Sequence, residues 1–195
     1  MIAPVTLATW IAFCSPSADP ALATALVMAG SNGDPALITD AGGQLQKVAV
    51  LRKPGQQEFY VGLTQIPASQ LRAAGIPPEA ALNPCNNISL GWQLWSEAHT
   101  YAKTKEPTQW KSVSFAFSWY RDRQPALETP YSKKATNLAI NHTPVAPAPA
   151  GSVLYNEIAA IWSIGQAQIL RSELPGSRLH QSRSLAGWAR ANLLR

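Results

Sequence analysis

Apolar residues in this chain recur mainly at helical spacing, and short stretches rich in proline and glycine separate the apolar runs. Asp19 followed by Pro20 has the order of an N-cap and a first helical residue, so it marks the start of one helix. The segment at about 86–103 is apolar over a wide face and is expected to be central. The pattern predicts helices at about 4–14, 20–30, 67–74, 86–103, 109–120 and 130–141.

Two short runs between these helices have the character of strands. Leu45–Arg52 and Glu58–Val61 flank Pro54-Gly55, which is a hairpin signal. The body of the protein is therefore expected to be an α+β domain that is mainly helical and contains one small β-hairpin.

The composition changes over residues 143–195, about the last quarter of the chain. Residues 143–151, TPVAPAPAG, predict an extended, semi-rigid linker. Beyond it, Val153–Leu170 is amphipathic, and Leu185–Leu194 predicts a last short helix. This divides the chain into a body at 1–142, the linker and a helical tail at 152–195. The tail must cover its apolar face either by packing back on the body or by docking on a partner, and the sequence leaves both possibilities open.

Charge and hydropathy limit the possible partners. The net charge is +5, and residues 151–195 carry five Lys/Arg against two Asp/Glu. This mildly basic tail suits an acidic polymer, an anionic surface or a partner protein, but its charges are too sparse to predict nucleic-acid binding.

No apolar run reaches the length of a transmembrane helix, so no transmembrane segment is expected. We interpret Pro4–Cys14 as the first helix rather than as part of a signal peptide, because no basic region precedes it.

The two cysteines, Cys14 and Cys85, are either buried free thiols or a disulfide. A disulfide becomes the favoured interpretation if the protein lies outside the cytoplasm. They are too few for a zinc site, and neither metal-ligand spacing nor a Ser-His-Asp arrangement is found. His99 is expected at the surface of its helix. No metal or cofactor is predicted.

Four short motifs occur in an order that carries more information than any one of them. In chain order they are Gly30–Pro35 (GSNGDP), Gly62–Ile66 (GLTQI), Asn83–Gly91 (NPCNNISLG) and Ala116–Tyr120 (AFSWY). Together they resemble the lytic transglycosylase domain of the lysozyme superfamily over about residues 10–140. They most resemble the peptidoglycan hydrolase of type IV secretion and conjugation systems, in which an early cysteine pairs with the one in the Asn-Pro-Cys motif.

This resemblance implies a lysozyme-like fold, a disulfide between Cys14 and Cys85, and a place in the bacterial periplasm or cell envelope. It implies peptidoglycan glycan strands as the binding partner and no cofactor. Secretion-system proteins are expected partners of the tail at 152–195, which lies outside the resemblance.

The resemblance also exposes a missing group. The family uses one Glu at the end of the second helix as general acid, with a pKa raised by apolar surroundings. Alignment on Ser31 and Pro35 places that acid at Gly30, and a shift by one places it at Ala29. Neither residue can transfer a proton. Arg121 also replaces the Asn that follows Tyr in the family motif.

Other positions of the family motifs remain. Ser31, Gln65, Asn87 and Tyr120 are the candidate substrate-binding residues. Gln65 and Tyr120 can bond and stack on an N-acetyl sugar, or they can be polar groups of helix packing, and both interpretations stay open. Glu58 is a weak candidate for a substitute acid, with a solvated charge beside a turn as the alternative. Asp34 is expected to cap a turn, and Glu79 to be a helix N-terminal charge.

Three functional hypotheses follow. The first is a lytic-transglycosylase-like protein that has lost its acid and binds peptidoglycan or acts as a scaffold. The second is an active lytic transglycosylase that uses Glu58. The third is an unrelated helical adaptor, in which Cys14 and Cys85 lie too far apart to bridge.

Overall fold

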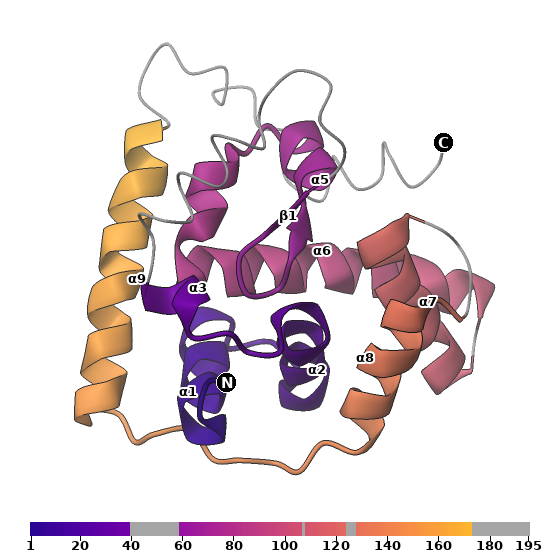
Figure 1. The fold of residues 1–195 in the computed structure, drawn as a ribbon, viewed down its shortest axis with the longest axis horizontal. Helices are drawn as coiled ribbons and strands as arrows, with labels where there is room; N and C mark the ends of the chain where they lie inside the picture. The colour runs from indigo at the N-terminus through magenta and orange to yellow at the C-terminus, as the bar shows by residue number, and fades with distance from the viewer. Residues whose placement is uncertain (40–58, 107, 124–127, 173–195) are drawn as a thin grey trace.

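The computed structural model describes residues 1–39, 59–106, 108–123 and 128–172 (Figure 1). It is mainly helical with one small antiparallel sheet, which confirms the α+β class. The elements are α1 (Pro4–Cys14), α2 (Pro20–Ser31), α3 (Ala36–Thr39), β1 (Tyr60–Val61), β2 (Ile66–Pro67), α5 (Ala68–Ala73), the 3₁₀ helix η1 (Pro78–Leu82), α6 (Pro84–Lys105), α7 (Gln109–Asp122), α8 (Pro130–Ile140) and α9 (Val153–Ser172).

Side-chain caps followed by proline fix the starts of three helices. The side chain of Asp19 accepts a hydrogen bond from the N–H of Leu22 at the start of α2, as predicted. Asn83 caps α6 and Thr129 caps α8 in the same way. In all three helices the capping residue is followed by a proline, which has no N–H to satisfy and fits the first helical turn.

The observed hairpin differs from the expected one. Of the predicted strands, 45–52 and Glu58 lie outside the described residues, and only Tyr60–Val61 at the end of the second is seen as a strand. It pairs with Ile66–Pro67, in the register Tyr60 to Pro67 and Val61 to Ile66. The motif that was expected to follow a hairpin therefore forms the hairpin turn itself, because Gly62 and Gln65 both have positive φ and reverse the chain within four residues.

Helix α6 is the central element, as expected. It contacts α1, α2, α7 and α9, and the ribbon shows these helices arranged around it (Figure 1). One apolar cluster includes Trp95 and Phe117 where α6 meets α7, and a second includes Trp10 and Ile88 where α6 meets α1. Because α6 contributes to both clusters, it joins the two halves of the core.

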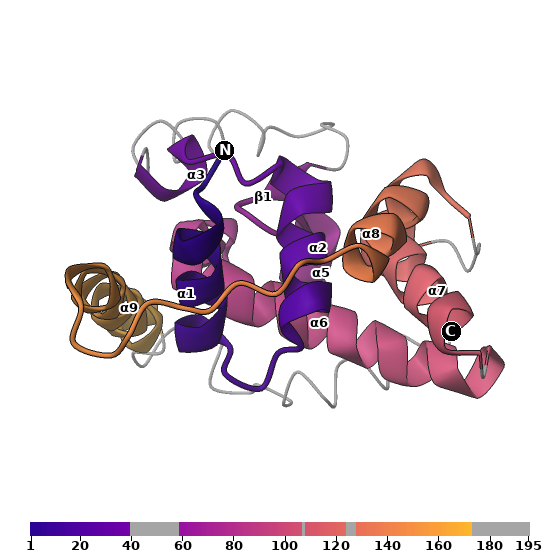
Figure 2. The same cartoon turned by 90° about the horizontal axis from the view of Figure 1, so that it is seen from below.

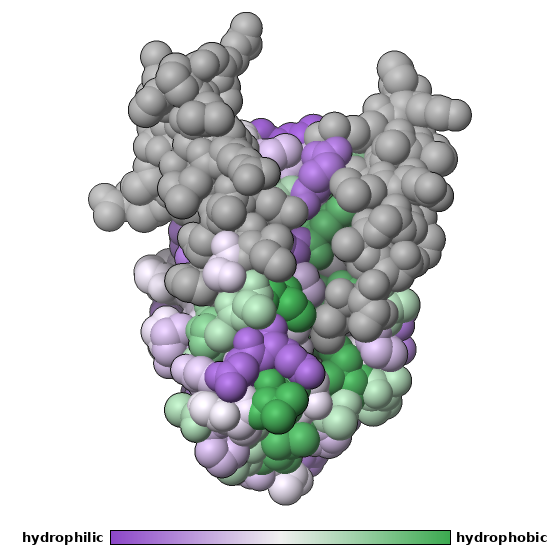
Figure 3. All heavy atoms as spheres, turned by 90° about the vertical axis from the view of Figure 1, so that its left-hand side faces the viewer, coloured by the Kyte–Doolittle hydropathy of each residue, from purple (hydrophilic) through white to green (hydrophobic). Residues whose placement is uncertain are grey.

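The linker and α9 return to the body. After α8 the chain crosses α2 and α1 without helix or strand (Figure 2), and the N–H of Ala148 donates to Oγ1 of Thr9 at 2.8 Å. Ile158 of α9 is 1% exposed in the second cluster, and Tyr155 packs edge-on against Phe13. Seen from the left-hand side of Figure 1, the coloured surface of the molecule carries hydrophilic and hydrophobic patches next to one another (Figure 3). Of the two possibilities for the tail, its described part packs back on the body.

The rest of the tail, including the short helix predicted at 185–194, lies outside the described residues. No helix within the described part of the chain combines the length and the apolar character required to cross a membrane.

Candidate functional site

The turn at Gly62–Gln65, named here the Thr64 turn, is where the four sequence motifs meet. It contacts Gly30 at the end of α2, Asn87 and Gly91 on α6, and Tyr120 on α7. These residues come from segments that are widely separated in the chain. The geometry of this meeting point determines what each predicted site residue can do.

Asn87 fastens the Thr64 turn to α6. Its Oδ1 accepts hydrogen bonds from the N–H of Thr64 at 2.7 Å and from the Thr64 hydroxyl at 2.9 Å. Its Nδ2 donates to the carbonyl oxygens of Val61 at 2.9 Å and Ala81 at 3.0 Å. The side chain is 0% exposed, and both of its polar atoms are used twice. In this arrangement Asn87 supports the turn and presents no group to a sugar.

Two glycines make room for these bonds. A Cβ atom at Gly62 would meet Nδ2 of Asn87 at 2.2 Å, and Gly62 also has a φ of +69°. A Cβ atom at Gly91 would meet Oγ1 of Thr64 at 2.3 Å. The glycines of the second and third motifs are therefore required by one close contact between the hairpin and α6.

Tyr120, on α7, bonds the Thr64 turn from a second helix. Its hydroxyl donates to the carbonyl oxygen of Thr64 at 2.9 Å, and its ring is 1% exposed. Burial raises the pKa of this phenol above its ordinary value, so it stays protonated at neutral pH. Gln70 donates from Nε2 to the backbone carbonyl of Tyr120 at 2.6 Å. Of the two interpretations given for Tyr120, this geometry favours a packed polar group.

Gly30 lies against Gln65 of the turn. A Cβ atom at Gly30 would be 3.1 Å from Cγ of Gln65 and 3.3 Å from the Thr64 carbonyl oxygen. Gln65 has a φ of +53° and donates from Nε2 to the carbonyl oxygen of Gly62 at 2.7 Å. Ser31 donates to the carbonyl oxygen of Val27 at 3.1 Å. Gln65 and Ser31 are both partly exposed, so they remain the predicted residues that can reach a ligand.

A lysine that the motifs do not include also reaches this end of α2. Nζ of Lys134, on α8, donates to Oδ1 of Asn32 at 2.8 Å and to the carbonyl oxygen of Ala29 at 3.3 Å. A positive charge near the last carbonyls of a helix is favoured by the helix dipole. The sequence gives no signal for this contact, because Lys134 lies about a hundred residues further along the chain.

Three carboxylates, those of Asp34, Glu58 and Glu97, bear on whether the site has an acid. Asp34 accepts from the N–H of Ala36 at 3.0 Å, which confirms its predicted role as a turn cap. Glu58 lies outside the described residues. Glu97, on α6, was not predicted, and burial raises its pKa to about 7. Glu97 follows Gly91 by six residues on α6, and no hydrogen bond or ion pair among the described residues links it to the Thr64 turn.

His99 is half-buried, not at the surface as expected. Its ring lies 4.8 Å from that of Trp95, and Nε2 is 3.3 Å from the Ser112 hydroxyl. Burial and then the nearby charge of Lys103 lower its pKa to about 4, so the ring is neutral at pH 7.

The disulfide between Cys14 and Cys85 is present and joins α1 to α6, with a Cα–Cα distance of 5.1 Å. The adaptor hypothesis expected these cysteines to lie too far apart to bridge, and this distance contradicts that expectation. Cys85 precedes Asn87 by two residues on α6, so the cross-link lies close to the Thr64 turn in the chain. Disulfides of this kind are formed and kept in oxidising compartments.

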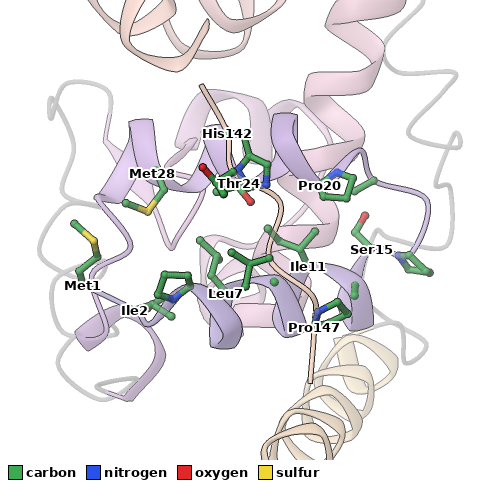
Figure 4. Close-up of a pocket in the computed structure, with 17 residues that line it drawn as sticks. Met1, Ile2, Leu7, Ile11, Ser15, Pro20, Thr24, Met28, His142 and Pro147 are labelled. Atoms are coloured by element: carbon green, nitrogen blue, oxygen red, sulfur yellow. The ribbon is translucent and has the colours of Figure 1, made fainter. Parts of the chain in front are cut away.

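A separate apolar pocket of about 450 Å³ lies between α1, α2 and the linker. Leu7 and Ile11 of α1, Met28 of α2 and Pro147 of the linker contribute to its wall (Figure 4). Its few polar groups include His142, where the linker begins. The sequence predicted the linker but not the pocket, since the pocket exists only because the linker crosses both helices.

Comparisons with known proteins add no name to this geometry. Among the described residues, no group of three or more His, Cys, Asp or Glu is placed to hold a metal ion. No protein-family model, no curated protein and no solved structure matches the chain.

Proposed function

We propose that this protein is a lytic-transglycosylase-like protein of the bacterial cell envelope that binds peptidoglycan glycan strands without cleaving them. In this role it serves a type IV secretion or conjugation system as a glycan-binding or scaffold component. The disulfide and the lack of a membrane-crossing helix in the described residues are compatible with a periplasmic location.

One observation carries the proposal: four motifs that resemble the family in sequence order also meet in space. Gly30, Asn87, Gly91 and Tyr120 all contact the turn around Thr64. An accidental set of motifs has no reason to converge on one turn. The convergence supports a shared architecture, whereas each motif alone is too short to do so.

The proposed loss of cleavage rests on Gly30. Protonation of a leaving glycosidic oxygen needs an acid within hydrogen-bond reach, and glycine supplies none. The space beyond Gly30 is taken by the side chain of Gln65. Binding can persist without the acid, because Gln65 and Ser31 are partly exposed at the same place.

The test combines a pull-down with a cleavage assay on purified peptidoglycan. The wild-type chain should sediment with peptidoglycan and release no anhydro-muropeptides. Gly30→Glu reinstates a carboxyl group and should produce a low level of anhydro product. Gly30→Ala is the matched control, since it adds the same Cβ crowding against Gln65 without an acid.

Two results would overturn the proposal. Failure of the wild-type chain to sediment with peptidoglycan would remove the binding role. Release of anhydro-muropeptides by the wild-type chain would remove the loss of activity. In that second case, abolition of release by Glu58→Gln would identify Glu58 as the acid.

A further inference from the structure

A second cavity lies at the C-terminal end of α7, close in the chain to Tyr120, which bonds the Thr64 turn. It has a volume of about 540 Å³. Arg121 and Thr129 line it together with Tyr60 of β1. Arg121 directly follows Tyr120, yet its side chain belongs to this cavity. No part of the proposed glycan-binding role uses the cavity.

Arg121 contacts aromatic rings and forms no ion pair with a carboxylate of the described residues. Its Cζ lies 3.4 Å from the centre of the Tyr60 ring and 5.4 Å from that of Tyr131. The first distance is that of a guanidinium stacked on the ring face. Stacking leaves the N–H groups in the guanidinium plane free to donate. Nη1 is buried and has no hydrogen-bond partner in the part of the chain that the structure describes.

A buried donor on a charged group without a partner is rare, because its lost hydration is not replaced. The side chain of Arg121 also lines the cavity, so a ligand bound there is a source of the acceptor that the guanidinium lacks among the described residues. The planar fork of a guanidinium matches a carboxylate or a phosphate. Both are anions, so the remaining charges of the cavity must decide between them.

Those charges favour a single negative charge. Among the described lining residues, Arg121 and Arg123 are basic and Asp122 is acidic, an excess of one positive charge. Thr129 and Pro130 also line it, so the positive end of the α8 dipole contributes to the same side. One net charge balances a carboxylate, whereas a phosphate dianion would face the carboxylate of Asp122 with an excess of negative charge.

We propose that the Arg121 cavity binds a carboxylate of the ligand, with the guanidinium of Arg121 as its donor fork and the Tyr60 ring as the platform that holds the fork in place. This inference rests on the proposed function for the source of that carboxylate. In peptidoglycan the group is either the lactyl carboxylate of a muramyl sugar without a peptide or a carboxylate of the peptide stem.

Calorimetric titration with three probes tests the inference. Chitotetraose has the N-acetyl sugars and no carboxylate, a peptide-free muramyl glycan has the lactyl carboxylate, and the free peptide stem has carboxylates and no sugar. The wild-type chain should bind at least one acidic probe tenfold or more tightly than Arg121→Gln does. Affinity for chitotetraose should be the same in both. The acidic probe that loses affinity identifies the source.

Matched variants separate the donor fork from charge and from folding. Arg121→Lys keeps the charge but not the fork and should lose most of the same affinity. Tyr60→Leu removes the platform and should weaken the acidic probe in the same direction. Lys103→Gln removes one exposed positive charge from α6 and should change nothing. A thermal melt of each variant shows that it is folded.

Each outcome decides a different point. Equal affinity of Arg121→Gln and the wild-type chain for the acidic probes overturns the inference, and so does full retention in Arg121→Lys. Binding of chitotetraose without tighter binding of either acidic probe overturns the inference and leaves the proposed function standing. Binding of the peptide alone, lost in Arg121→Gln, supports the inference and counts against the glycan. No binding of any probe overturns both.

Discussion

The Thr64 turn and the Arg121 cavity differ in how their buried polar atoms are satisfied, although Tyr120 and Arg121 are neighbours in the chain. At the turn, the hydroxyl of Tyr120 and both polar atoms of Asn87 have protein partners. At the cavity, Nη1 of Arg121 has no partner among the described residues, and neither has the hydroxyl of Tyr131, whose ring centre lies 5.4 Å from Cζ of Arg121.

This difference separates two reasons for a polar residue to be buried. A buried group that is fully bonded within the protein stabilises one backbone arrangement, and it has little left for a ligand. A buried group without a partner reduces stability in the free protein, and where its side chain also lines a cavity we interpret it as part of a site completed from outside. On this basis the turn is the support and the cavity is a place of recognition.

The largest expected effect comes from the cross-link next to the turn. Replacement of Cys14 and Cys85 by serine should lower the free energy of unfolding by about 4 kcal/mol, because the disulfide closes a long loop in the unfolded chain. Denaturant unfolding measures it, and the wild-type chain under reducing conditions is the control. A loss below about 1 kcal/mol would show that packing alone holds α1 to α6.

The next effect tests whether the turn depends on one amide. Asn87→Ala removes the hydrogen bonds that Asn87 makes to the N–H of Thr64 and to two carbonyl oxygens, and it should cost about 3 kcal/mol. Asn86→Ala is the matched control, since the Asn86 side chain makes one hydrogen bond, to the carbonyl oxygen of Ala80, and should cost about 1 kcal/mol. Equal losses in both variants would contradict the role given to Asn87.

Alkaline pH should act on both regions through their tyrosines. Burial raises the pKa of Tyr120 and of Tyr131 in the folded protein, whereas both ionise near pH 10 in the unfolded chain. The unfolded state therefore binds fewer protons above pH 10, and stability falls as the pH rises. Between pH 10 and pH 11 each tyrosine should remove about 1 kcal/mol, because half of the unfolded phenols are already ionised at pH 10. Unfolding curves at these pH values measure the fall in the free energy of unfolding. In each Tyr→Phe variant this fall should be smaller by the contribution of the tyrosine that was replaced.

The smallest effect compares the two hydroxyls at neutral pH. Tyr120→Phe removes a bonded hydroxyl and should cost about 1 kcal/mol. Tyr131→Phe removes a hydroxyl without a partner and should change the free energy of unfolding by about zero or raise it slightly. Chemical denaturation of both variants side by side measures the difference. A reversed order would remove the distinction between the two regions.

The sequence predicts most of the helical frame, because caps and proline positions are local signals. Asp19 with Pro20, and Asn83 with Pro84, mark helix starts wherever they lie in the fold. The sequence pattern predicts that Gly62–Gln65 follows a hairpin, whereas in the structure these residues form the turn of the hairpin. Its reversal depends on a positive φ at Gln65, a residue that gives no turn signal of its own.

The site was predictable only as a set of motifs. Their order identified the residues around Thr64, but it could not separate a residue that supports the turn from one that binds a ligand. That distinction depends on partners from distant segments, such as the carbonyl oxygen of Val61 for Asn87. Arg121 was noted as a departure from the family motif. Its cavity depends on Tyr60, which no local pattern connects with it.

The return of α9 to the body has a consequence for synthesis. Ile158 completes the cluster that also holds Ile2, Cys14 and Cys85. A chain growing from its N-terminus can form α1, α6 and the disulfide well before this residue has been added. During that interval the face of α1 and α6 that Ile158 later covers is open to solvent. A nascent chain is then most exposed to aggregation and to the binding of chaperones.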